Sequence, residues 1–126
     1  MSLLSLNLKD VKDLCSVEPG EYKLKIEDCK QATSKNGNEY IMAVFSLPDV
    51  ADAKNIHHVM MLPAATDDEK KTNARLRAIK TFLLAFGADI SADIDLGNLT
   101  GMEAWALLVE EDDDEYGTKN RVKRFL

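Results

Sequence analysis

Residues 20–47 read GEYKLKIEDCKQATSKNGNEYIMAVFSL, and they carry the clearest strand and turn signals in the chain. Apolar and charged residues alternate over 22–27, which predicts a strand with one buried and one charged face. Within 33–38, Asn36-Gly37 is typical of tight hairpins because both residues tolerate positive φ angles. Apolar residues occupy both faces of the predicted return strand, 40–47. An antiparallel hairpin is therefore expected.

The rest of the chain continues this pattern of strands around one helix. A third strand is predicted over 56–62 and is ended by Pro63. Thr66 and Glu69 have the spacing of a capping box, which predicts a helix that ends at Gly87. A short helical turn over 94–99 and strands over 102–109 and 118–126 follow. The predicted inward positions of the long helix are Leu76, Ile79, Leu83 and Phe86.

The predicted element order is β-β-β-α-β-β, in a mainly β domain with one long helix. This is the order of the five-stranded OB-fold barrel, which binds oligonucleotides or oligosaccharides on its strand 2–3 face. Leu8, Val11 and Leu14 recur at helical spacing after Asn7, so a short helix over 8–15 is also expected. We predict one OB-fold domain over 1–126, with residues 1–16 as an N-terminal helical extension.

Charge is distributed unevenly along the 126 residues, whose formal net charge is −6. An acidic run occupies 110–115, and outside it acidic and basic residues are equal in number. The last nine residues contain only basic charges. Net charge therefore does not exclude a nucleic-acid partner. We expect no membrane association and no signal peptide, and we interpret Cys15 and Cys29 as reduced thiols of a cytoplasmic protein.

Several short motifs resemble one known family in their order and spacing. They are Glu18-Pro19-Gly20-Glu21-Tyr22, Ser34-Lys35-Asn36-Gly37, Leu83-Leu84-Ala85-Phe86-Gly87, Leu99-Thr100-Gly101 and Tyr116-Gly117-Thr118-Lys119-Asn120-Arg121-Val122. Over about residues 17 to 126 the chain resembles small phage-encoded single-stranded-DNA-binding proteins. The resemblance implies an OB-fold, binding without sequence preference, no reaction, and the host cytoplasm as location. The chain departs from the acidic tail of many such proteins, because it ends in Lys123-Arg124-Phe125-Leu126.

Binding of a single strand requires cations for phosphates and aromatic faces for bases. In an OB-fold the charged outer residues of strands 1 and 5 and the first hairpin can converge beside one groove, although each can equally be solvated surface. Tyr40 is the favoured stacking residue, or else an amphipathic rim residue. The predicted nucleic-acid-binding residues are Lys23, Lys25, Lys35, Tyr40, His57, Tyr116, Lys119, Arg121, Lys123 and Phe125.

Other features have more than one interpretation. Trp105 is expected in the core or at an oligomer contact rather than as a base platform. Met42 and Val44 indicate a covered outer face, either a homodimer contact or a base-binding floor. His57-His58 cannot chelate one ion, because adjacent strand residues point to opposite sides, and which of the two faces the groove stays open. The acidic run is interpreted as a solvated hairpin tip, with the hypothesis that it folds over the basic groove.

No motif of a hydrolase, nucleotide-binding enzyme or metal centre is present in the sequence, so we expect no catalytic activity, cofactor or metal. The leading prediction is a single-stranded-DNA-binding protein that works in phage DNA replication or recombination, with replication or recombination proteins among its partners. The alternative is a protein-interaction module on the same fold, without nucleic-acid binding.

Overall fold

The computed structural model describes residues 3, 5–91, 93–115 and 117–126. Its elements follow the order β1 (Gly20–Thr33), β2 (Glu39–Ser46), β3 (Ile56–Met61), α1 (Glu69–Ala85), the 3₁₀ helix η1 (Leu96–Leu99), β4 (Glu103–Asp113) and β5 (Gly117–Phe125). The strands form one antiparallel sheet in the order β3-β2-β1-β4-β5. The predicted mainly β architecture with one long helix is confirmed.

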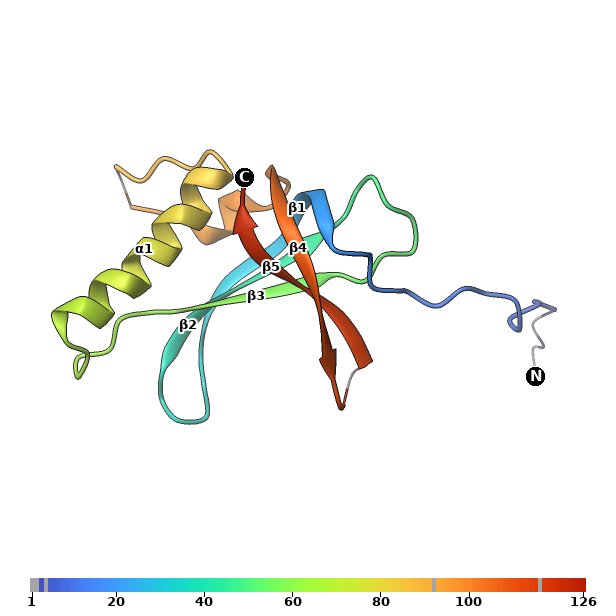
Figure 1. Ribbon diagram of the computed structural model, residues 1–126, viewed down its shortest axis with the longest axis horizontal. Helices are drawn as coiled ribbons and strands as arrows, with labels where there is room; N and C mark the ends of the chain where they lie inside the picture. Colours follow the sequence, from blue (N-terminus) through green and yellow to red (C-terminus); the bar gives the residue numbers. More distant parts are fainter. Residues whose placement is uncertain (1–2, 4, 92, 116) are drawn as a thin grey trace.

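Strand β1 is the centre of the sheet because it pairs with two partners. Its first half pairs with β4, from Gly20 opposite Leu108 to Lys25 opposite Glu103. Its second half pairs with β2, and a register shift between Ile26 and Asp28 separates the two halves. A bulge of this kind bends a strand and increases its twist. The sheet therefore curls, and the β1–β2 and β4–β5 hairpins extend to the same side of the molecule (Figure 1).

The concave side of this sheet holds the hydrophobic core. Five aromatic rings from four elements meet there, with ring centroids 5.2–6.3 Å apart. They are Phe45 of β2, His58 of β3, Phe82 and Phe86 of α1 and its C-terminal cap, and Phe125 of β5. Phe45 contacts the other four rings and is fully buried. We call this set the aromatic cluster.

The sheet is open in its hydrogen bonding, so the predicted five-stranded barrel is not closed by strand pairing among the described residues. Strands β3 and β5 are the two edges, and no ladder joins them within the described residues. Side chains make the connection instead: the rings of His58 and Phe125 lie 5.5 Å apart, edge to face. Helix α1 packs against both edge strands and covers the opening between them (Figure 1).

The predicted N-terminal helix is wrong. Residues 5–14 are exposed and contain no helix, and the segment runs away from the body of the protein (Figure 1). Near its end, Cys15 forms a parallel bridge with Ala53. Leu8, Val11 and Leu14 are 58–69% exposed, so the apolar spacing has no surface to pack on. Without tertiary packing, a helix of this length does not repay the cost of its nucleation.

Two local predictions are also corrected. The helix N-cap is Asp68, whose carboxylate accepts a hydrogen bond from the Lys71 amide at 2.7 Å, so Thr66 and Glu69 do not form the expected box. Leu76 of the predicted inward set is 49% exposed. In the first hairpin only Gly37 has a positive φ (83°), because the turn spans 34–38 and not two residues. The helix ends before Gly87 as predicted, with φ 77° at that residue.

The strand β4 is longer than predicted. It continues through Asp113, so much of the acidic run lies in a paired strand and not in a loop. The run therefore has a fixed register against β5, in which Glu111 lies opposite Lys119 and Val109 opposite Arg121.

Removal of the central ring of the aromatic cluster tests this account of the core. Phe45→Ala should lower the free energy of unfolding by about 3–5 kcal/mol, because a large buried ring leaves a cavity. Val44→Ala is the matched control, since Val44 is the adjacent residue on the opposite, partly exposed side of β2. Urea denaturation measures both. Similar losses for the two variants would contradict a core centred on Phe45.

Candidate nucleic-acid interface

The side of β1, β2 and β3 that faces away from the core is unusually apolar for a solvent-facing surface. Strand pairing arranges its side chains in three rows: Asp28, Val44 and His57; Lys30, Met42 and Val59; and Ala32, Tyr40 and Met61. We call these nine residues the outer face. Val59 is 49% exposed, and Tyr40, Met42, Val44 and Met61 are partly exposed. Apolar side chains therefore reach solvent from all three strands.

Lysines border this surface. Lys30 lies within the outer face, Lys25 lies further along the same side of β1 opposite Ser46, and Lys35 lies in the β1–β2 turn. Within the described residues, no carboxylate forms an ion pair with any of these three lysines. Their charges are available to an anionic ligand. Asp28 is an acidic member of the same face.

Trp105 lies on the solvent side of β4, which corrects the expected core position, while the expected oligomer contact stays a prediction. Its side chain is 50% exposed, and the Lys23 ammonium lies 6.0 Å from the ring centroid. The same ammonium is 4.0 Å from the Asp49 carboxylate. Ala104, Ala106 and Leu108 are buried, and the alternation of a strand therefore puts Trp105 on the other side of β4.

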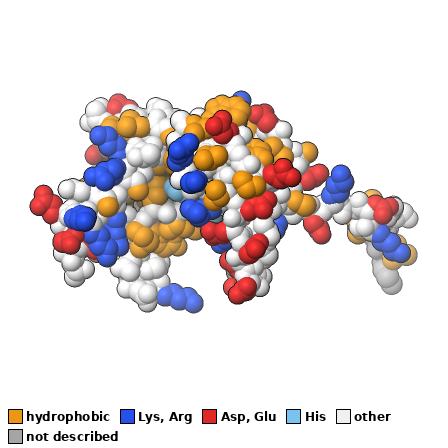
Figure 2. All heavy atoms as spheres, in the orientation of Figure 1, with side chains coloured by type: hydrophobic (Ala, Val, Ile, Leu, Met, Phe, Trp, Pro, Cys, Tyr) orange, Lys and Arg blue, Asp and Glu red, His pale blue; other side chains and the backbone are white. Residues whose placement is uncertain are grey.

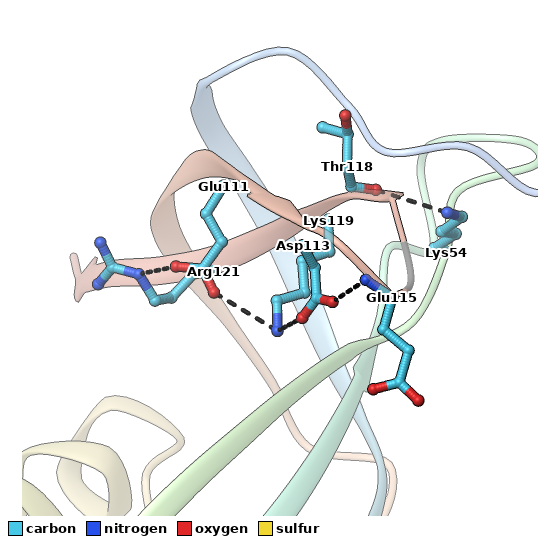
Figure 3. Close-up of polar contacts among 7 residues, drawn as sticks. All are labelled: Lys54, Glu111, Asp113, Glu115, Thr118, Lys119 and Arg121. Atoms are coloured by element: carbon cyan, nitrogen blue, oxygen red, sulfur yellow. Dashed lines mark hydrogen bonds and ion pairs between the residues drawn. The ribbon is translucent and has the colours of Figure 1, made fainter.

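The cations of β5 near the hairpin tip are already paired (Figure 3). The Lys119 ammonium lies 3.3 Å from a carboxylate oxygen of Asp113 and 3.5 Å from one of Glu111. Glu111 also accepts a hydrogen bond from Nε of Arg121 at 3.0 Å. The hydrogen bond to Asp113, aided by Glu111, raises the pKa of Lys119. These two acids neutralise the cations of their own hairpin and do not fold over the outer face.

The last residues of β5 lie beside α1, on the other side of β3 from the outer face. Here a groove of about 380 Å³ opens between helix and strand. It is lined by His58, Ala74, Arg77, Ala78, Thr81, Val122, Lys123, Arg124 and Phe125. Figure 2 shows lysine and arginine side chains gathered beside a histidine on this side of the molecule. We call this the helix groove.

His58 is neutral at the floor of the helix groove. Its ring packs among Phe45, Phe82 and Phe125, and this burial lowers its pKa below the usual 6.5. His57, the adjacent residue, is exposed on the outer face. The two adjacent histidines therefore lie on different surfaces: His57 is part of the outer face, and His58 lines the helix groove.

The predicted site residues thus separate into groups. Tyr40 and His57 share the outer face, with Lys25 and Lys35 at its border, while Lys23 lies beside Trp105. Lys119 and Arg121 belong to the paired hairpin, and Lys123 and Phe125 line the helix groove. Tyr116 lies outside the described residues. Lys30, Val59 and Arg77 lie on these surfaces but were not predicted, although the alternation of β3 carried a signal for Val59.

The remaining reactive groups have structural surroundings. Cys15 and Cys29 are free thiols, and burial together with the nearby Asp28 charge raises the pKa of Cys29 to about 11. No three metal-ligating side chains come together in the part of the chain that the structure describes. No helix among the described residues is both long and apolar enough to cross a membrane.

The geometry defines a curled β-sheet domain with two candidate binding surfaces. Residues 5–124 match the model of the family described as "Protein of unknown function (DUF669)", and the chain belongs to this family. A search of curated proteins finds no match to the sequence.

The buried imidazole predicts a dependence of stability on pH. Because the pKa of His58 is lower in the folded protein, the unfolded chain takes up a proton first as pH falls below about 6.5. The stability due to neutral His58 is therefore present above that pH and is lost as pH falls towards the folded pKa. Urea midpoints at pH 7.5 and 5.5 should show the loss.

His58→Gln should remove much of this difference, whereas His57→Gln should retain it because His57 is exposed. An unchanged difference in His58→Gln would contradict the assignment.

Proposed function

We propose that this protein is a non-catalytic single-stranded-DNA-binding protein of the OB-fold type, and that the outer face holds the strand without sequence preference. The observation that carries the proposal is the combination, on one solvent-facing surface, of aromatic and aliphatic side chains with lysines that have no ion-pair partner among the described residues. Bases stack on such surfaces irrespective of their identity, and lysines track the backbone.

The topology supports the same proposal. In an OB-fold the first strand pairs with the second and the fourth, as β1 does here with β2 and β4. Ligands of that fold bind the strand 2–3 face, beside the loops that join strands 1–2 and 4–5. The outer face occupies the corresponding strands, and the two hairpins that carry those loops extend to one side (Figure 1). We place the protein, by the family resemblance, in phage DNA replication or recombination in the host cytoplasm.

A labelled oligo-dT titration at several salt concentrations tests the proposal. Substitution of Lys25, Lys30 and Lys35 by Ala should lower the slope of log K against log salt by about 2, because each contact to single-stranded phosphate contributes about 0.7. Tyr40→Ala should cost about 1–3 kcal/mol of binding free energy if a base stacks on it. If the protein instead binds only duplex DNA or only other proteins, the oligo-dT titration should show neither the change in slope nor the loss of affinity.

The matched control replaces Lys9, Lys70 and Lys80 by Ala, which removes the same charge from exposed positions away from the outer face. An equal loss of slope in the control would show that the change follows from the net charge of the protein and not from phosphate contacts at the outer face. If the wild-type protein fails to bind oligo-dT at low salt, the apolar outer face instead favours the alternative function, a protein-interaction module.

The paired hairpin gives a second expectation. Glu111→Gln removes the carboxylate that contacts both Lys119 and Arg121. Lys119 keeps its contact with Asp113, but Arg121 loses its ion-pair partner among the described residues, so Arg121 should become available to phosphate and oligo-dT affinity should rise at low salt. Glu110→Gln makes the same change in charge at the neighbouring residue, which forms no ion pair with them in the described structure. Mobility-shift titrations compare the two variants. Equal affinities for both would argue against release of Arg121.

A further inference from the structure

The helix groove combines three cations with an apolar floor. Arg77 approaches from α1, and Lys123 and Arg124 approach from β5. A register shift places Lys123 between the pairs Leu107–Arg124 and Leu108–Val122, so the usual alternation is interrupted and both basic residues line the groove. No ion pair neutralises these three cations among the described residues.

Between the cations, the groove is lined mainly by apolar side chains. Ala74 and Ala78 of α1 face Val122 and Phe125 across the groove, and the Phe125 ring is held by its edge-to-face contact with His58. The volume, about 380 Å³, is at the small end of the range of roughly 300–1,000 Å³ for ligand pockets. Cations on two walls with an apolar floor match the chemistry of one nucleotide, which has a phosphate and a planar base.

The groove and the outer face meet at one strand. His57 and His58 are consecutive in β3 and point to opposite sides, one to the outer face and the other to the groove. Strand β3 is an edge of the sheet, so no further described strand separates the two surfaces there. A nucleic-acid strand that leaves the outer face across β3 comes to the side of this strand on which His58 lines the groove.

We propose that the helix groove is a second contact for the same single strand and holds one nucleotide, with its phosphate between Arg77 and Lys123 and its base against Phe125. This inference rests on the proposed function of the outer face. An acidic peptide would also satisfy the cations, but it would not use the exposed part of the Phe125 ring or the proximity of the outer face across β3.

The experiment compares two oligonucleotides, of about 4 and about 16 thymidines, which are the limits of the site size for one OB-fold. The double variant Arg77→Ala and Lys123→Ala should bind the longer one roughly 25-fold less tightly than the wild type at about 0.1 M salt. Two lost phosphate contacts lower the salt slope by about 1.4, and over the roughly tenfold span between 1 M and 0.1 M salt this slope gives that factor. Its affinity for the shorter one, which the outer face alone can hold, should not change. Fluorescence anisotropy measures both.

The control is Lys70→Ala and Lys80→Ala, which removes two exposed charges from α1 outside the groove and should leave both affinities unchanged. Wild-type affinity of the groove variant for the longer oligonucleotide, or an equal loss for both lengths, would overturn the second contact while the function of the outer face stands. Failure of the wild-type protein to bind either oligonucleotide would instead overturn the proposed function.

A direct probe separates the two chemistries. In NMR spectra of the wild-type protein, the ring signals of His58 should shift on addition of the longer oligo-dT and not on addition of a glutamate decapeptide at the same charge concentration. Shifts with the peptide and none with oligo-dT would assign the groove to an acidic protein segment and overturn the nucleotide site.

Discussion

The aromatic cluster is the interaction on which the rest of the structure depends. The sheet is open, and its edge strands β3 and β5 belong to opposite ends of the strand order. His58 and Phe125 bring these edges together, while Phe82 and Phe86 attach α1 to the same point and Phe45 contacts all four rings. Packing of aromatic rings here replaces the hydrogen bonds that would close a barrel, and it brings α1, β3 and β5 together around the helix groove.

Both candidate surfaces follow from this arrangement. The core takes one side of β2 and β3, so the apolar residues on the other side remain at the solvent and form the outer face. The end of β5 is held beside α1 by Phe125, which brings Lys123 and Arg124 near Arg77. Asn120, two residues before Val122 on β5, is buried. Its side chain accepts a hydrogen bond from the Val17 amide and donates one to the Val17 carbonyl, both at 2.8 Å, and so attaches the N-terminal segment to the same strand.

Charge pairing decides which cations remain available. Lys119 and Arg121 look equivalent to Lys25 and Lys35 in the sequence, but the register of β4 with β5 places Glu111 and Asp113 beside them. An acidic run can therefore pair with the cations of its own hairpin and leave the cations of other surfaces unpaired among the described residues. This explains how a chain with a net charge of −6 retains cationic regions.

The sequence by itself determined the five strands, the single helix, the site of the first hairpin and the end of the helix at Gly87, because alternation, turn residues and caps are local signals. Local signals failed where packing decided: Leu8, Val11 and Leu14 have helical spacing but no partner surface, and Leu76 follows the helical pattern yet is exposed. Strand register and the approach of distant segments were decided only by the tertiary structure. Strand register determined which acids contact Lys119 and which side of β4 carries Trp105. The approach of distant segments brought His58, Arg77 and Lys123 to one groove.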